Sequence, residues 1–201
     1  MPPLISALLL AADSSSRMGQ PQALLPLQDK AAILHCLTPL LHGVVSEIIV
    51  VLGGGNEPAA ALLKDMSLKI YYNTLPGGDM AKSVRIGLQG MAPQCRHALI
   101  CLLDHPLVQP ATIKQLVSAS RDNPDKIIVP TFQEQPGHPT LLPRPLLAEA
   151  YQGFTLREII ARHPQKVVLL PVADEGVVLE METPEQYQAI CRRLEESTHV
   201  N

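Results

Sequence analysis

Near its amino terminus the chain reads Leu8-Leu9-Leu10-Ala11-Ala12-Asp13-Ser14-Ser15-Ser16-Arg17-Met18-Gly19-Gln20-Pro21-Gln22. An apolar run with strand character, residues 4–12, stops at a loop of small, polar and basic residues, and a helical pattern resumes near Ala31. In an α/β protein, phosphate-bearing ligands bind at the carboxyl end of the first strand, because backbone N–H groups and one or two cations can reach an anion there. An ordinary surface turn would also fit. The order of small residues, arginine and glycine favours a ligand-binding loop.

Strand-like and helix-like segments alternate along the rest of the chain. The apolar runs predict strands over residues 4–12, 47–52, 68–72, 97–103, 126–131 and 166–171, with 177–180 as a weaker candidate. Helical spacing predicts helices over residues 31–41, 58–66, 80–89, 111–120, 144–151, 155–162 and 184–196. Repeated β-α units predict an α/β fold with one doubly wound, mostly parallel sheet in a three-layer αβα arrangement. We expect residues 1–201 to form a single domain.

Composition excludes several classes of protein. Of the 201 residues, 46% are hydrophobic and 17% charged, which argues against disorder. The net charge is −3, no dense basic run occurs, and only 3% of residues are aromatic, so nucleic acid is not expected as a partner.

The cysteines and the amino terminus bear on the compartment. Cys36, Cys95, Cys101 and Cys191 form no C-x-x-C pair, so we expect buried, reduced thiols. The first apolar run is shorter than the roughly 20 residues that span a bilayer, and no Lys or Arg precedes it as in a signal peptide. A cytoplasmic protein without a membrane partner is expected.

Four polar loops follow predicted strands, at residues 13–22, 73–83, 104–106 and 137–140. The carboxyl ends of the strands line one crevice in this architecture, so we expect these loops to share a site. Asp104 directly follows the apolar run 98–103 and is well placed to hold Mg²⁺, which commonly binds one or two carboxylates together with phosphate oxygens. A turn or cap aspartate before Pro106 is the structural alternative.

The order Leu-Ala-Ala-x-x-Ser-x-Arg-Met-Gly-x-Pro-x-x-Leu-Leu-Pro over residues 10–26 resembles the signature loop of the MobA-like nucleotidyltransferases. Within that family, the chain is most similar to the molybdenum-cofactor cytidylyltransferases. Further similar blocks follow in the family's order: Asn73 with 78–88, then 103–108, 137–139 and 180–187. The first and last blocks are specific when taken together, and the blocks span nearly the whole chain.

The resemblance implies a Rossmann-like, glycosyltransferase-A-like fold and a Mg²⁺-dependent transfer of a nucleotidyl group. The donor would be an NTP, with CTP favoured, the acceptor a phosphorylated molecule such as molybdopterin, and the product pyrophosphate. It also assigns roles to residues. The catalytic residues would be Arg17 and Asp104, the metal ligands Asp104, Glu180 and Glu182, the acceptor-binding residue His138, and the nucleotide-binding residues Leu10, Ala11, Ala12, Asp13, Ser15, Arg17, Gly19, Gln22, Asn73 and Ser83.

Five positions depart from the family pattern. The family has glycine at Asp13 and lysine at Gln22, so this loop gains a negative charge and lacks a cation. The family's Asp-x-Asp is Glu180-x-Glu182 here, and its last acid is replaced by Gln186.

Other hypotheses stay open. A catalytically impaired homologue could hold a nucleotide or pterin, or dock on a molybdoenzyme, without transferring anything. A sugar-phosphate or small-alcohol nucleotidyltransferase could use the same fold. Gly53-Gly54-Gly55 lacks the order of a dinucleotide-binding loop, and Ser14-Ser15-Ser16 lacks a nucleophile elbow. His105 and His163 are assigned no role.

Overall fold

The computed structural model describes residues 4–12, 20–42, 44–75 and 79–198. An eight-stranded sheet forms its centre. Seven of its strands follow the order β10-β7-β9-β6-β1-β4-β5, and the short strand β8 pairs with β7 outside this order. The strands are β1 (Leu4–Ala11), β4 (Glu47–Gly53), β5 (Lys69–Asn73), β6 (Cys95–Leu102), β7 (Ile127–Phe132), β8 (Gln135–Pro136), β9 (Thr140–Pro143) and β10 (Val167–Pro171). The pairs β5–β4, β4–β1, β1–β6 and β7–β10 are parallel, and β9 runs antiparallel between β6 and β7.

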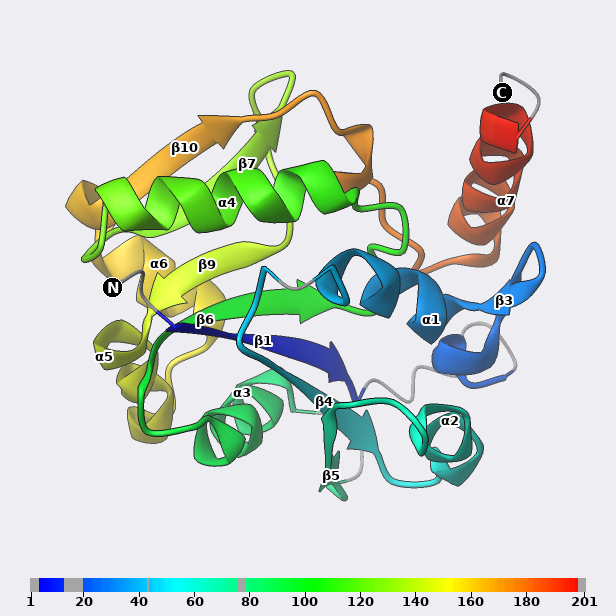
Figure 1. Cartoon of the computed structure of the whole chain (residues 1–201), viewed down its shortest axis with the longest axis horizontal. Helices are drawn as coiled ribbons and strands as arrows, with labels where there is room; N and C mark the ends of the chain where they lie inside the picture. The colour runs from blue at the N-terminus through cyan, green and yellow to red at the C-terminus, as the bar shows by residue number, and fades with distance from the viewer. Residues whose placement is uncertain (1–3, 13–19, 43, 76–78, 199–201) are drawn as a thin grey trace.

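Helices cover both faces of this sheet (Figure 1). The helices are α1 (Ala32–Leu37), α2 (Glu57–Leu63), α3 (Met80–Gly90), α4 (Pro110–Asp122), α5 (Arg144–Leu147), α6 (Leu156–Arg162) and α7 (Pro184–Thr198). Short 3₁₀ turns lie between them: η2 (Gln22–Leu24), η3 (Thr38–Leu40), η4 (Ala148–Gln152), η5 (Pro164–Lys166) and η6 (Glu175–Val177). The predicted three-layer, mostly parallel α/β fold is therefore confirmed.

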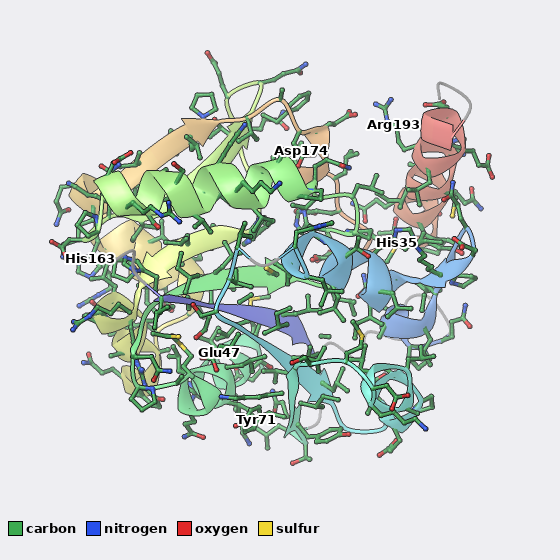
Figure 2. The ribbon with its side chains drawn as sticks, viewed as in Figure 1. His35, Glu47, Tyr71, His163, Asp174 and Arg193 are labelled. Atoms are coloured by element: carbon green, nitrogen blue, oxygen red, sulfur yellow. The ribbon has the colours of Figure 1, made fainter. Side chains whose placement is uncertain are left out.

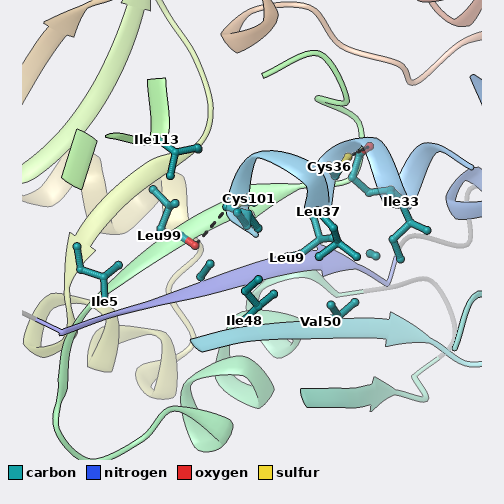
Figure 3. Packing of buried hydrophobic residues seen from close by; sticks show 14 of the residues in the cluster. Ile5, Leu9, Ile33, Cys36, Leu37, Ile48, Val50, Leu99, Cys101 and Ile113 are labelled. Atoms are coloured by element: carbon teal, nitrogen blue, oxygen red, sulfur yellow. Dashed lines mark hydrogen bonds between the residues drawn. The ribbon is translucent and has the colours of Figure 1, made fainter. Parts of the chain in front are cut away.

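The two cores follow from the alternation of side chains along β1. Ile5 and Leu9 point to one face, where they pack with residues of α1 and α4 such as Leu37 and Ile113 (Figure 3). Leu8 and Leu10 point to the other face and pack beneath α3, α5 and α6. A strand buried on both faces reads as a continuous apolar run, which is why this segment could be recognised from sequence.

A smaller cluster lies beyond the carboxyl ends of β1 and β6, on the side to which their arrowheads point (Figure 1). There α7 packs against the hairpin formed by β2 (Pro26–Leu27) and β3 (Lys30–Ala31). Buried Leu25, Leu27, Ala32, Met181 and Ile190 form its centre. Tyr187 Oη donates a hydrogen bond of 2.6 Å to the carbonyl of Pro26, which joins the last helix to the segment that follows the first strand.

The structure corrects several details. Strand β9 was not predicted, since Thr140 was expected in a loop but begins an antiparallel strand, and the two-residue strands β2, β3 and β8 were not predicted either. Residues 177–180 are not a strand, because η6 ends at Val177 and the chain continues irregularly toward α7. The expected helices over 31–41 and 144–151 each divide into a short α-helix and a 3₁₀ turn.

The cysteine prediction is largely confirmed. All four cysteines are free thiols, and three of them are buried, whereas Cys191 on α7 is half-buried. Across the described part of the chain, no helix has the length and apolar character needed to cross a membrane.

Candidate active site

The order of the central strands places a crevice between the tips of β1 and β6. Strands β4 and β5 lie on one side of β1, and β6 lies on the other, so the strand order reverses at this point. Such a reversal leaves an open crevice at the carboxyl ends, where ligands bind in doubly wound sheets. The Leu103 N–H donates to the carbonyl of Leu10 at 3.2 Å, which brings the turn carrying Asp104 beside the start of the first loop.

The beginning of that loop is tightly packed. Leu10, Ala11 and Ala12 are buried, so only their backbone groups could reach a ligand. A Cβ at Gly53 would lie 2.7 Å from the carbonyl oxygen of Ala12, which explains why the tip of β4 carries a glycine. The predicted site residues Asp13, Ser15, Arg17 and Gly19 lie outside the described residues, and their roles stay predictions.

A cleft of about 610 Å³ opens at the same edge of the sheet. Its polar lining comprises Asp104, His105, His138, Glu180 and Glu182. The structure therefore gathers Asp104, the acidic segment (residues 180–182) and the 137–140 loop around one space. Apolar side chains of β7, β10 and α6, together with Arg157, line much of the rest of the cleft. The cleft therefore combines an acidic, cation-attracting part with apolar surface that suits a flat or aliphatic group.

The three carboxylates of the cleft influence one another electrostatically. Burial raises the pKa of Glu180, and the negative charges of Asp104 and Glu182 raise it further. Within the described ranges, no three His, Cys, Asp or Glu side chains are close enough to form a ready metal cage. Magnesium commonly binds one or two carboxylates and completes its shell with phosphate oxygens and water. These residues therefore fit a divalent cation that arrives with a polyphosphate.

Two histidines lie side by side next to Asp104. The ring centroids of His105 and His138 are 5.2 Å apart, and Nε2 of His105 lies 3.9 Å from Oδ1 of Asp104. Burial lowers the pKa of each ring to about 4, so both are neutral at physiological pH. Nδ1 of His138 has no hydrogen-bond partner among the described residues and is itself buried, although the residue lines the cleft.

His105 is the site residue that the sequence analysis missed. The available signal was the dipeptide His-Pro, which occurs at 105–106 after β6 and again at 138–139 before β9. Both dipeptides come to the same edge of the sheet because β9 is antiparallel, and that direction was not predicted.

The wall beside His138 depends on close backbone packing. The His138 N–H donates to the carbonyl of Val177 at 2.8 Å, and a Cβ at Gly137 would lie only 2.1 Å from that carbonyl oxygen. Asp174 fixes the same segment to the first turn of α4 by accepting from the N–H of Gln109 at 2.8 Å (Figure 2). The 174–178 segment is thereby held against the 137–138 loop.

Asn73 and Ser83 lie next to each other, as expected for residues that share one site, but both are buried. Nδ2 of Asn73 donates to Ser83 Oγ at 2.9 Å and to the carbonyl of Asp79 at 3.2 Å. Asp79 in turn caps α3 by accepting from the Ala81 N–H at 2.9 Å. These side chains link the end of β5 to the start of α3, and a direct contact with nucleotide stays a prediction.

Gln22, at the position where the family has lysine, is buried, and its Nε2 donates to the carbonyl of Met181. Gln186, the other glutamine that departs from the family pattern, accepts from the N–H groups of Glu182 and Thr183 at 2.8 and 2.9 Å. Both side chains therefore act on the backbone of the acidic segment.

Comparisons of the sequence with known proteins all identify nucleotidyltransferases. A family model described as the MobA-like NTP transferase domain matches residues 7–167. The molybdenum cofactor cytidylyltransferase of Escherichia coli (strain K12) is 25% identical over 191 residues, which cover 91% of this chain and 93% of that protein.

Solved structures agree on the fold. The crystal structure of Rv0371c from Mycobacterium tuberculosis H37Rv superposes with a TM-score of 0.83 at 25% identity and covers 94% of this chain and 98% of that one. A structure of Rv0371c in complex with manganese gives a TM-score of 0.77 at 20% identity and covers 96% of this chain and 100% of that one.

Proposed function

Because the chain belongs to the MobA-like NTP transferase family, we propose that it is a Mg²⁺-dependent cytidylyltransferase. The donor is CTP and the acceptor a phosphorylated molecule of the molybdopterin type. The observation that carries the proposal is the position of Asp104, at the tip of β6 and in one cleft with Glu180 and Glu182. The Escherichia coli relative, a molybdenum cofactor cytidylyltransferase by name, supports the choice of CTP and acceptor. The manganese complex of Rv0371c supports a divalent cation.

In the proposed reaction, an oxygen of the acceptor phosphate attacks the α-phosphorus of CTP. A new phosphorus–oxygen bond forms, the bond from the α-phosphorus to the bridging oxygen breaks, and pyrophosphate leaves with that oxygen. Such a displacement requires in-line positioning and charge neutralisation more than a protein nucleophile. A bound Mg²⁺ would supply the positive charge that offsets the triphosphate.

The residues of the chain then have distinct tasks. Asp104, Glu180 and Glu182 would hold the cation, and Arg17 would contact the triphosphate. The backbone of Leu10, Ala11 and Ala12 and the loop residues Asp13, Ser15 and Gly19 surround the phosphates, and Gln22, Asn73 and Ser83 support the nucleotide site. His138, which lines the cleft, contacts the acceptor, and the apolar side chains of β7, β10 and α6 face the acceptor's ring system.

The decisive experiment measures pyrophosphate release by the purified chain with Mg²⁺, each NTP in turn, and molybdopterin cofactor as acceptor. We expect release with CTP that requires both metal and acceptor. Equal release with all four nucleotides would refute the choice of CTP. Release that does not depend on the metal would refute the role given to the carboxylates.

One observation favours a second candidate, a homologue that binds the nucleotide or the pterin, or docks on a molybdoenzyme, without catalysis. The amide of Gln22 is engaged with the carbonyl of Met181, so this position offers no cation to a phosphate. Calorimetric binding of CTP with Mg²⁺, without any pyrophosphate release, would favour this candidate. A gain of turnover in the double variant Asp13→Gly with Gln22→Lys would then identify these two positions as the cause.

A further inference from the structure

The acidic segment at the cleft is attached to the first loop by one buried side chain. Gln22 is only 5% exposed, and its Nε2 donates to the main-chain carbonyl of Met181, 159 residues further along the chain. Gln22 begins η2, close behind the loop that follows β1. One amide group therefore joins the end of this loop to the middle of the acidic segment.

Met181 gives the segment a second anchor. Its side chain is fully buried in the small cluster with Leu25 and Leu27, so the segment cannot move outward without exposing it. The neighbours on either side, Glu180 and Glu182, both line the cleft that also contains Asp104. Fixing the peptide of Met181 therefore fixes the backbone from which both glutamate side chains extend.

Gln186 holds the same backbone from the other end. Its Oε1 accepts from the N–H groups of Glu182 and Thr183, and its own N–H donates to Thr183 Oγ1 at 3.3 Å. This reciprocal arrangement is a capping box at the start of α7. Two glutamines thus hold residues 181–183, one through a carbonyl and one through two amides.

The segment has to be held because its charges oppose the geometry. Glu180, Glu182 and Asp104 carry like charges around one cleft. Repulsion between them favours outward movement of residues 180–183, which belong to no helix or strand. A buried amide-to-carbonyl hydrogen bond resists such movement, because breaking it leaves a polar group without a partner.

We propose that Gln22 is a positioning residue that holds Glu180 and Glu182 toward Asp104, and so couples the loop after β1 to the binding of the divalent cation. Gln186 supports the same arrangement from α7. The metal part of this inference rests on the proposed function, whereas the mechanical part concerns the chain alone.

The test compares Gln22→Met with the wild-type chain. Methionine has a similar length but cannot donate, so the tie to Met181 is lost while the cluster remains filled. A matched control is Asn123→Leu, which removes another amide-to-carbonyl bond, from Asn123 Nδ2 to Ala119 at 3.0 Å, at the end of α4 away from the cleft. Gln186→Leu is a second variant that loosens the segment from its other side, should Gln22→Met not fold.

Two measurements keep the parts of the inference separate. Hydrogen–deuterium exchange over residues 179–187 should accelerate about tenfold in Gln22→Met and stay unchanged in Asn123→Leu, because a hydrogen bond of this kind accounts for roughly such a factor. Affinity for Mn²⁺ in the presence of CTP, followed by electron paramagnetic resonance, should fall about three- to tenfold in Gln22→Met alone.

Each outcome decides something. Unchanged exchange in Gln22→Met would overturn the tie itself. Faster exchange with unchanged Mn²⁺ affinity would overturn the coupling to the cation. A wild-type chain that binds no Mn²⁺ with CTP would overturn the proposed function, and the exchange measurement would still decide whether Gln22 holds the acidic segment.

Discussion

The two edges of the central sheet carry clefts of opposite charge. At the amino edge, where β1 and β6 begin, a cleft of about 810 Å³ is lined by Arg96, Arg121 and Arg144. At the carboxyl edge, the cleft of about 610 Å³ is lined by Asp104, Glu180 and Glu182. Judged by volume and by attraction for a phosphate, the first would be the better candidate.

Topology and hydrogen bonding favour the smaller cleft instead. Arg144 at the amino edge donates to the carbonyls of Ala92 and Cys95, at 3.1 and 3.4 Å, so this guanidinium holds the chain ahead of β6. At the carboxyl edge the strand order reverses and polar loops converge. A cleft lined by carboxylates can bind a polyphosphate when a divalent cation lies between the carboxylates and the phosphate oxygens.

The largest expected difference between the edges concerns their aspartates. Asp104→Asn should lower the rate of CTP-dependent pyrophosphate release at least about 100-fold, since a lost metal ligand weakens charge neutralisation in the transition state. Asp125→Asn, which changes an exposed acid of the amino-edge cleft, is the matched control and should leave the rate unchanged. Equal losses in the two variants would remove the distinction between the edges.

Next in size is a steric change at the carboxyl edge. Gly137→Ala should lower the free energy of unfolding by about 3 kcal/mol, because a Cβ 2.1 Å from the Val177 carbonyl forces the backbone apart. Gly54→Ala, where the nearest atom lies 3.8 Å away, should cost less than about 1 kcal/mol. Chemical denaturation at pH 7 measures both, and a small effect at Gly137 would show that the wall of the cleft yields easily.

The histidine pair should make the carboxyl edge sensitive to acid. The folded-state pKa of His138, about 4, lies below the unfolded value of 6.5, so protons bind preferentially to the unfolded chain as the pH falls through this window. Stability should therefore drop by about 2 kcal/mol from this residue between pH 7 and pH 5. His138→Gln should remove this part of the pH dependence, while His42→Gln, on the exposed surface, should not. Identical pH profiles for wild type and His138→Gln would contradict the burial of that ring as a neutral group.

The smallest expected effect lies at the amino edge. Burial opposes ionisation of Glu47, but hydrogen bonds from Lys69 and Ser6 outweigh it and lower the pKa of this carboxyl (Figure 2). Its contribution to stability is present above its unfolded pKa of about 4.5 and is lost as the pH falls through the lower folded value. Glu47→Gln should thus cost about 1 kcal/mol at pH 7, and this cost should shrink as the pH falls from 4.5 through the lower folded value, with pyrophosphate release unaffected. A loss of turnover would show that the two edges are coupled.

Much of this molecule could be predicted from local patterns, and the reasons are physical. The runs that became β1, β4 and β6 are apolar on both faces because helices cover both, and Asp104 could be singled out because it follows such a run directly. Strand β9 was missed because its four residues directly follow Pro139 and end at Pro143, which leaves too little periodicity to recognise.

Other features depend on contacts that no local pattern encodes. The bond from Gln22 to Met181 joins residues 159 apart, and nothing near either position signals it. His105 was assigned no role, because its proximity to His138 arises only when β9 returns antiparallel beside β6. Sequence therefore predicted the strand tips, while the side chains that meet across them required the folded structure.

The direction of β9 has a consequence for how this scaffold can be altered. Strand β9 runs toward the amino edge, so the connection that precedes it, residues 137–139, lies at the carboxyl edge and borders the cleft. This connection follows directly on the two-residue strand β8, which pairs only with β7 among the described strands. Residues inserted in the exposed turn that joins β7 to β8, Gln133 and Glu134, would extend that border without disturbing any parallel strand pair or the packing of Gly137 against Val177. If the proposed function holds, acceptor range could be engineered by grafting loops at this turn, away from the predicted nucleotide site.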